Sequence, residues 1–337
     1  MVNQEDFNSI LRSFNIKARC ISQRKVRHIS LYDLNLAIGT RVKDVSKYLD
    51  EISMALKSYS KPVIKIIPQE GIIQMEVVDD RPEKISFIET YEKIKKQDGL
   101  LPLYIGNSVS GDDIIFDLAK NPHTLIAGAT GSGKSVLLHT IIGNIMSYDD
   151  VITYIVDPKN IEFENYKGSA NINVCNNFDE AIKCLVFLNT VMEERYKLIV
   201  ENSYPVNYFL SSQKQYPKIV LIIDEFADLL AQDYGKTLHK LICQLAQKSR
   251  AAGIFCILAT QRPSVSVISG EIKANFSARI SCQTASMIDS RVILDAPGAE
   301  HLIGSGDAII KNYKYNYTRF QSAYTTPEEL VSIYNNS

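Results

Sequence analysis

Residues 128–135 read Gly128-Ala129-Thr130-Gly131-Ser132-Gly133-Lys134-Ser135 and match the pattern GxxxxGK[ST]. The glycines of this pattern let backbone N–H groups converge on phosphate oxygens without clashes from Cβ atoms. The lysine supplies a positive charge to the β- and γ-phosphates, and the hydroxyl that follows it is a ligand for Mg²⁺. The stretch therefore predicts a loop that binds ATP with Mg²⁺, in which Lys134 also takes part in catalysis and Ser135 holds the metal.

The residues on either side of this loop support the same interpretation. A short apolar strand is expected over residues 124–127, and a strongly apolar helix is expected over residues 135–146. The N-terminus of such a helix directs the positive end of its dipole at a bound phosphate. We therefore interpret the segment as a phosphate-binding loop rather than as a structural glycine turn.

The pattern of the chain from about residue 101 onward is an alternation of short apolar runs and longer amphipathic stretches. Strands are expected at 124–127, 151–156, 219–223, 254–259, 278–282 and 307–310, and helices at 135–146, 178–200, 237–251 and 286–294. This alternation is typical of a mainly parallel sheet with helices on both faces. An α/β nucleotide-binding domain is therefore predicted over residues 101–312.

A small α+β subdomain is predicted before this domain, over residues 24–80. Its expected elements are a strand within 26–36, a helix over 42–57, and a hairpin formed by residues 63–67 and 72–78. Residues 1–23 are then an N-terminal segment, residues 81–100 a connection with a short helix, and residues 313–337 a C-terminal extension.

Polar side chains follow two of the predicted strands. The strand at 219–223 ends in Asp224 and Glu225, and the strand at 254–259 is followed closely by Gln261. An aspartate at such a strand end holds Mg²⁺ in P-loop enzymes, so Asp224 is assigned to the metal. Glu225 is predicted to orient or deprotonate the attacking water, which favours a hydrolase over a passive switch. Gln261 is the predicted sensor of the γ-phosphate.

The composition of the chain is that of an ordinary globular protein. Of its 337 residues 45% are hydrophobic and 22% are charged, and the net charge is −1, so nucleic-acid binding would need a local basic patch. The six cysteines include no CxxC pair and, with the five histidines, show no metal-ligand spacing, so buried free thiols are expected. No run reaches the roughly 18 apolar residues of a membrane helix, and no apolar signal core begins the chain, so a cytoplasmic location is expected.

Several further motifs occur in a fixed order around the phosphate loop. They are Asp117-Leu118-Ala119-Lys120-Asn121-Pro122-His123, Val156-Asp157-Pro158-Lys159, Met192-Glu193-Glu194-Arg195-Tyr196, Ile223-Asp224-Glu225-Phe226-Ala227-Asp228-Leu229, the run 245–254, the run 258–264, Ile272-Lys273-Ala274-Asn275, the run 288–295 and Gly304-Ser305-Gly306-Asp307. Over residues 101–310 this series resembles the motor of the FtsK/SpoIIIE family of double-stranded DNA translocases. Residues 24–80 resemble, more loosely, the small α subdomain that precedes the RecA-like β subdomain in that family.

The resemblance implies an ATP-hydrolysing ring motor with a RecA-like P-loop core. It implies a homo-hexamer that holds ATP between subunits and double-stranded DNA in its centre, with a loading or portal protein as a further partner. Arg250 matches the arginine finger that the family presents to the neighbouring subunit's γ-phosphate, and Arg279 is a second candidate for such a cation. The DNA-facing loops of the family correspond to residues 262–275, where Arg262 and Lys273 are the expected phosphate contacts.

The sequence also departs from the family pattern. Met287 stands where the family commonly has a lysine, which predicts one DNA-facing charge fewer. The familiar members carry a membrane anchor and a winged-helix domain, and neither is recognised here. We therefore expect a motor without its own tether, of the kind that suits a mobile element, plasmid or virus. A motor on single-stranded DNA in conjugation, a helicase, a viral genome-packaging ATPase and a switch that does not translocate remain alternatives.

Overall fold

The computed structural model of the protein describes residues 2–79, 84–88, 98–211 and 215–335. The chain divides into two compact units. The first comprises Met1–Lys84 with Val109–Asp112 and His301–Ile303, and the second comprises Ile85–Ser108, Asp113–Glu300 and Gly304–Ser337. The short helix expected within the connection 81–100 falls largely outside the described residues.

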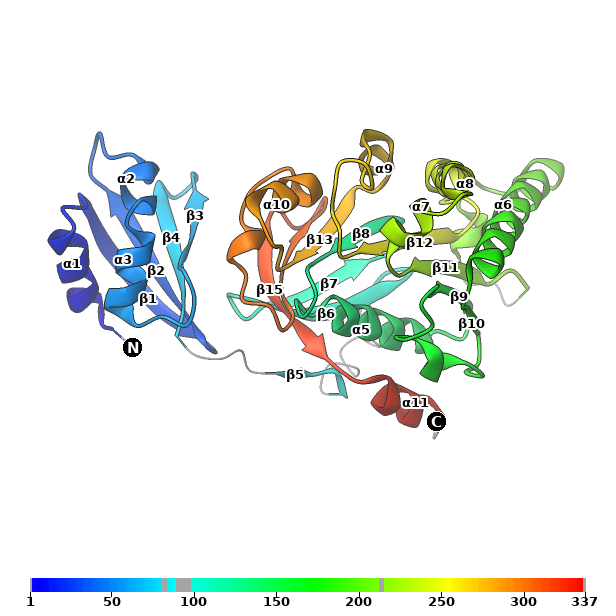
Figure 1. Cartoon of the computed structure of the whole chain (residues 1–337), viewed down its shortest axis with the longest axis horizontal. Helices are drawn as coiled ribbons and strands as arrows, with labels where there is room; N and C mark the ends of the chain where they lie inside the picture. Colours follow the sequence, from blue (N-terminus) through cyan, green and yellow to red (C-terminus); the bar gives the residue numbers. More distant parts are fainter. Residues whose placement is uncertain (1, 80–83, 89–97, 212–214, 336–337) are drawn as a thin grey trace. The chain divides into compact units, whose positions relative to one another are not determined.

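The first unit is an antiparallel sheet with helices packed on one face (Figure 1). Its strands, in the order β1-β2-β4-β3, are β1 (Ala18–Val26), β2 (Ile29–Leu36), β4 (Ile72–Val78) and β3 (Val63–Ile67), and its helices are α1 (Gln4–Ser13), α2 (Val42–Ser46) and α3 (Leu49–Leu56). Successive side chains of a strand point to opposite faces. Tyr32 and Leu34 accordingly join Phe7 of α1 in one buried cluster, whereas Leu31 belongs to another.

Two details of this unit differ from the sequence-based expectation. The strand expected within 26–36 is present as β2 (Ile29–Leu36), but Val26 belongs to the preceding strand β1 and pairs with Ile29 across a turn in which Arg27 takes a positive φ of 53°. Arginine and histidine are not usual turn residues, so the turn gave no signal. The helix expected over 42–57 is interrupted between α2 and α3, where the ring of Tyr48 stacks on Phe14 with 5.7 Å between ring centroids.

The other expectations for this unit concern its second hairpin and the residue at which the unit begins. The hairpin of Val63–Ile67 and Ile72–Val78 has the expected bounds. The segment before residue 24 contains α1 and most of β1, and Phe7 and Leu11 of α1 are fully buried in the core of this unit. The unit therefore begins earlier in the chain than the expected subdomain.

The second unit is built on one large, mainly parallel sheet. Among the described residues its strand order is β10-β9-β11-β12-β8-β13-β14-β15-β6-β7, with β5 paired to β15. The bounds are β5 (Ile85–Ser86), β6 (Pro102–Ser108), β7 (Asp113–Asp117), β8 (His123–Ala127), β9 (Val151–Val156), β10 (Ile172–Cys175), β11 (Lys218–Ile223), β12 (Ile254–Thr260), β13 (Ala278–Cys282), β14 (Asp307–Lys311) and β15 (Thr318–Tyr324). The strands from β10 to β13 are parallel, and β14, β15, β6 and β7 extend the sheet in antiparallel pairs.

Helices cover both faces of this sheet, as predicted. They are α5 (Lys134–Met146), α6 (Phe178–Glu201), α7 (Phe226–Leu230), α8 (Gly235–Lys248), α9 (Gly270–Asn275), α10 (Met287–Leu294) and α11 (Pro327–Asn335), with short 3-10 turns at Glu164–Tyr166, Tyr208–Leu210 and Ala299–His301. In Figure 1, α5 and α11 lie on one side of the sheet, and α8, α9 and α10 lie on the other. None of the helices in the described ranges is long and apolar enough to cross a membrane.

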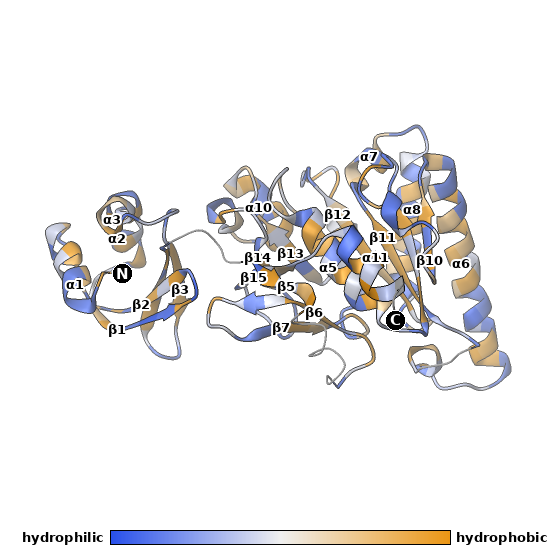
Figure 2. Ribbon diagram, turned by 90° about the horizontal axis from the view of Figure 1, so that it is seen from below, coloured by the Kyte–Doolittle hydropathy of each residue, from blue (hydrophilic) through white to orange (hydrophobic). Residues whose placement is uncertain are grey.

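The hydropathy of the helices follows their burial. α6 carries both hydrophobic and hydrophilic residues along its length (Figure 2), and its buried positions include Ala181, Leu185 and Leu188 at the three- and four-residue spacing of one helix face. α5 is different, because most of its residues are buried. It is enclosed between the sheet and the C-terminal segment of the chain.

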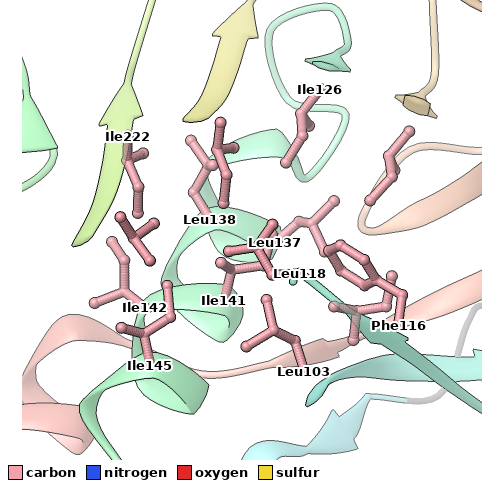
Figure 3. Close-up of a cluster of buried hydrophobic side chains, with 14 of the residues drawn as sticks. Leu103, Phe116, Leu118, Ile126, Leu137, Leu138, Ile141, Ile142, Ile145 and Ile222 are labelled. Atoms are coloured by element: carbon pink, nitrogen blue, oxygen red, sulfur yellow. The ribbon is translucent and has the colours of Figure 1, made fainter. Parts of the chain in front are cut away.

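The core of the second unit surrounds α5. Leu137, Ile141 and Ile145 of this helix lie among side chains from the parallel strands, such as Ile222, and from the antiparallel strands, such as Leu103 (Figure 3). Burying a leucine or isoleucine side chain contributes about 1.5–3 kcal/mol each. The same helix therefore joins the two halves of the sheet through apolar contacts.

Polar contacts also hold α5 against the antiparallel strands. The side chain of Asn144 accepts a hydrogen bond from the backbone N–H of Tyr104 (2.6 Å) and donates one to its carbonyl (2.9 Å). Thr140 donates to the carbonyl of Ala323 in β15 (2.8 Å). Because β15 and α11 pack on this core, with Phe320 and Leu330 fully buried, residues 313–335 of the expected extension (313–337) are part of the domain.

We predict that Asn144→Ala destabilises the second unit. The change removes the side-chain amide that bonds to the N–H and the C=O of Tyr104, and the loss of a buried hydrogen-bond partner costs about 1–3 kcal/mol for each group. The free energy of unfolding in urea should fall by roughly 2–6 kcal/mol. Asn202→Ala is the matched control, because Asn202 is exposed at the end of α6 and its side chain donates to the carbonyl of Leu198 in that helix. Equal losses in both variants would contradict this account.

Candidate nucleotide-binding site

The phosphate loop lies between the end of β8 and the start of α5, where glycine is required by close packing. Gly133 has a φ of 99°, and a Cβ atom on it would lie 2.2 Å from the backbone nitrogen of Gly306. A Cβ atom on Gly128 would lie 2.5 Å from Oγ of Ser132 and 2.7 Å from Cβ of Cys282. The loop therefore cannot take this path with larger residues at these two positions.

The backbone of the loop presents several N–H groups that the protein itself does not use. The N–H of Ala129 donates to the carbonyl of Gln283 (2.8 Å), and that of Ser132 donates to Ala129 (3.1 Å). Within the described part of the chain, no hydrogen bond is found for the N–H groups of Thr130, Gly131, Gly133, Lys134 and Ser135. Donors that converge in this way at the N-terminus of a long helix suit a phosphate group.

A buried ion pair joins the loop to the neighbouring strand ends. Nζ of Lys134 contacts Oδ1 of Asp224, which follows β11, and both side chains are buried. Each charge neutralises the other in a place where an isolated charge would be strongly unfavourable. The structure thus brings the predicted phosphate-binding lysine and the predicted metal-binding aspartate into direct contact, with Ser135 adjacent in the first turn of α5.

Glu225 is held in an unusual backbone conformation. Its φ of 54° and ψ of 63° lie in the left-handed region, which is strained for a non-glycine residue and is often found at functional sites. Its carboxylate accepts hydrogen bonds from Oγ1 of Thr260 (2.8 Å) and from the N–H of Gln261 (2.9 Å). The carboxylate is buried and is anchored to the end of β12. Sequence reasoning missed Thr260, although its position just before Gln261 at the strand end was a signal.

Gln261, the predicted sensor of the γ-phosphate, lies at the phosphate loop. Its Oε1 accepts a hydrogen bond of 2.8 Å from Oγ1 of Thr130. The end of β12 is therefore linked to the phosphate loop on one side and to Glu225 on the other. The predicted residues Lys134, Asp224, Glu225 and Gln261 thus meet at one edge of the sheet.

Two further features of the site were not assigned a role from the sequence. Lys159, after β9, places Nζ 2.7 Å from Oδ2 of Asp228. This hydrogen bond raises the pKa of Lys159 against the opposing effect of burial, and the charges of Glu225 and Asp224 add to the rise. Lys159 is therefore a cation beside the acidic residues that follow β11. In the sequence it stood out only as part of the motif Val156-Asp157-Pro158-Lys159.

The second feature is the turn before β14, which supports the phosphate loop. The N–H of Gly306 donates to the carbonyl of Ser132 (2.9 Å). Asp307 accepts hydrogen bonds from Nε and Nη2 of Arg319 (2.9 and 2.7 Å). The charge pair anchors the strand next to this turn, so the Gly304–Asp307 motif positions the loop from behind.

Arg250 is not at this site in its own chain. It precedes β12, whereas the phosphate loop lies at the other end of the adjacent parallel strand β8. Burial, with the charge of Arg250 as the second cause, lowers the pKa of His123 at the start of β8 to about 3, which places Arg250 near that end. A strand of seven residues spans about 23 Å. Arg250 is exposed, and no ion pair is found for it among the described residues.

The two predicted DNA contacts have different surroundings. Arg262 is exposed, and its backbone N–H donates to Oγ1 of Thr260 (3.1 Å). Lys273 places Nζ 2.6 Å from Oδ1 of Asp295, a carboxylate that Lys311 and Arg279 also contact. Partial burial raises the pKa of Asp295, but the bonds to these three cations outweigh it and lower the pKa well below its usual range.

Arg279, the second candidate for a cation acting on a neighbouring subunit, is bound within its own chain. Besides Asp295, its guanidinium donates to the carbonyls of Phe276 (3.2 Å), Lys273 (3.0 Å) and Ile293 (3.3 Å). These contacts engage Nε, Nη1 and Nη2. The structure therefore does not favour this role for Arg279.

The chain was compared with known proteins. It is 37% identical to the DNA translocase FtsK of Streptococcus pneumoniae over 342 residues, which cover 96% of this chain and 44% of that protein. It is 37% identical to the protein of the same name from Borreliella burgdorferi over 313 residues, which cover 89% of this chain and 40% of that protein. The chain thus spans less than half the length of these relatives.

Solved structures show the same fold. The conjugation coupling protein TcpA of pCW3, in a monomer form with ATPγS, superposes with a TM-score of 0.69 at 24% identity over 98% of this chain and 99% of that one. The cytoplasmic domain of the type VII secretion ATPase EccC of Thermomonospora curvata superposes with a TM-score of 0.63 at 21% identity over 75% of this chain and 34% of that one.

Two family models divide the chain as the structure does. The model of the FtsK alpha domain matches residues 2–79, which form most of the first unit, including the segment before residue 24. The model of the FtsK/SpoIIIE family matches residues 86–204 and 204–265, which contain the phosphate loop and the strand ends that meet it. The chain therefore belongs to the FtsK/SpoIIIE family.

Proposed function

We propose that the protein is an ATP-hydrolysing motor that moves along double-stranded DNA. The observation that carries this proposal is the distribution of the site over two edges of one sheet. Lys134, Asp224 and Glu225 meet at one edge, whereas Arg250 lies exposed at the other. Such a division suits a ring in which each subunit completes the site of its neighbour, and the FtsK relatives are named DNA translocases.

The residues of the site fit ATP with Mg²⁺. Bound MgATP would supply the phosphoanhydride bond to be hydrolysed and a cation that neutralises phosphate charge. The unused N–H groups of the loop would hold the phosphates, and Lys134 would exchange its contact with Asp224 for phosphate oxygens. Ser135 and Asp224 would hold the metal.

The water-activating role falls to Glu225. The hydrogen bonds from Thr260 and from the N–H of Gln261 hold its carboxylate at the strand end, where it would orient the attacking water and accept its proton. Because Gln261 also bonds to Thr130 of the phosphate loop, a change at the γ-phosphate would be transmitted through it to β12. The residues after β12 would then move with the state of the nucleotide.

The segment that follows β12 is the proposed DNA contact. Arg262 is exposed directly after Gln261, so a phosphate contact there would be coupled to the ATP site. Contacts with the phosphate backbone position a duplex without reading its sequence, as a motor requires. In this proposal the protein works as a homo-hexameric ring in the cytoplasm, with a loading or portal protein as its partner.

The first test is the steady-state ATPase rate with and without nucleic acid. Double-stranded DNA should stimulate the rate strongly, whereas single-stranded DNA and RNA of equal length should not. Glu225→Gln should bind ATP and fail to turn over, which assigns the measured activity to this site. Stimulation by single strands alone would instead support a conjugative or helicase-type motor. No response to any nucleic acid would contradict the proposal that the motor moves along double-stranded DNA.

We predict that Arg250→Ala binds ATP normally but hydrolyses it about 10³-fold more slowly or worse, because an arginine finger contributes about 10³–10⁵ to the rate. A mixture of Arg250→Ala and Glu225→Gln subunits should regain activity. The intact Arg250 of one subunit would then serve the intact site of the other. Lys248→Ala, which removes an exposed cation from the same helix end, is the control and should retain full activity. A mixture as inactive as its components would contradict action between subunits.

We predict different effects at Arg262 and Lys273. Arg262→Ala should weaken the binding of double-stranded DNA and lower the slope of log affinity against log salt concentration by about 1, as expected for one lost phosphate contact. Lys273→Ala should change this slope less and stability more, since Lys273 is paired with Asp295. Salt titrations of DNA binding and urea unfolding of both variants measure the difference. Equal slopes for wild type and Arg262→Ala would rule out that contact.

A further inference from the structure

A cluster of three metal-ligating side chains lies away from the phosphate loop, where α9 packs beside α8 (Figure 1). His239 and Cys243 are four residues apart on α8, and Glu271 lies on α9. One ligand atom from each of the three lies within 4.8 Å of the others, and the described residues contain no second group of this kind. Nitrogen, sulfur and oxygen donors from two separate helices therefore face one point.

The distances within the cluster are close to those of a tetrahedral metal centre. Sγ of Cys243 lies 3.7 Å from Nδ1 and 3.9 Å from Nε2 of His239. In a tetrahedral zinc site, with bonds of about 2.3 Å to sulfur and about 2.05 Å to nitrogen, these donors are about 3.6 Å apart. The two side chains on α8 thus need to move little to share a cation.

We propose that His239, Cys243 and Glu271 bind one zinc ion, with water as the fourth ligand. Glu271 is exposed, so solvent reaches the fourth position. A mixed set with a thiolate and an imidazole favours zinc over Mg²⁺ and Ca²⁺, which take oxygen ligands. This site is independent of the function proposed for the phosphate loop.

The surroundings of the three ligands support a metal. Oγ of Ser269 lies 3.4 Å from Nε2 of His239, which leaves Nδ1, the nitrogen nearer to Sγ, for the ion. Nε2 of Gln247 donates to Oε1 of Glu271 (3.4 Å). Partners of this kind orient the ligands of a metal, and their loss typically weakens binding about 10–100-fold.

Binding at this site has a defined proton balance. A cysteine thiol has an ordinary pKa of about 8.5 and carries its proton near neutral pH. Zinc binding would form the Zn–S bond as the S–H bond breaks and would release one proton to solvent. The bound ion would tie α9, which belongs to the proposed DNA-facing segment, to α8.

The experiment uses the full chain, stripped of metal and kept with excess Mg²⁺ so that the oxygen ligands of the ATP site are occupied. Zinc is measured by equilibrium dialysis, and cobalt(II) is titrated as a spectroscopic probe. We expect one zinc per chain and an absorption band of thiolate-to-cobalt charge transfer. Zinc should also raise the melting temperature and slow hydrogen exchange in α9.

The variants decide the assignment. Cys243→Ser should lose the cobalt band and the zinc-induced rise in melting temperature, while its metal-free form unfolds like metal-free wild type. Ser269→Ala should bind zinc about 10-fold more weakly. Cys175→Ser is the control for a partly exposed thiol elsewhere and should retain both signals. Absence of the band in wild type, or its persistence in Cys243→Ser, would overturn the proposal.

Discussion

The burial of α5 is the constraint on which the nucleotide site depends. This helix is enclosed by strands of the parallel and antiparallel halves of the sheet and by the C-terminal segment, so its axis cannot shift without disturbing the whole core. Asn144 fixes its far end to the backbone of Tyr104. The N-terminus of the helix, with the unused N–H groups of the phosphate loop, is consequently held at the carboxyl edge of the strands. A rigid position for these donors is what electrostatic binding of phosphate requires.

The acidic residues at this edge are placed by the neighbouring strands. Because β8, β12 and β11 are parallel and adjacent, the residues that follow them converge. Asp224 is paired with Lys134, and Glu225 accepts hydrogen bonds from Thr260 and Gln261, so both carboxylates have polar partners before any ligand is present. The strained backbone of Glu225 is part of this arrangement, since it turns the carboxylate toward β12. The site is therefore coupled to the segment that follows β12.

That segment and the helices beside it connect the chemistry to the proposed DNA contact. Gln261 links the phosphate loop to Arg262, and the cluster of His239, Cys243 and Glu271 lies where α9 meets α8. Asp295 contacts Lys273 of α9 together with Arg279 and Lys311. With zinc bound to the cluster, α9 would be held at Glu271 as well as at Lys273, which would limit movement after β12. Arg250, at the start of the loop that follows α8, adds an exposed cation at the opposite edge of the sheet.

The sequence by itself determined where the phosphate loop and the parallel strands lie in the chain, because both depend on local spacing and hydrophobic runs. It also singled out Asp224, Glu225 and Gln261, because they follow such runs. Only the tertiary structure decided which groups touch. The Lys134–Asp224 pair, the role of Thr260 and the pairing of Lys273 with Asp295 join residues far apart in the chain, and no local pattern encodes them. The same reason explains the missed strand β15, which lies between β14, its neighbour in the sequence, and β6, which precedes it by a long stretch of chain. It also explains the missed cluster of His239, Cys243 and Glu271, because its third ligand comes from another helix that only folding brings alongside the first two.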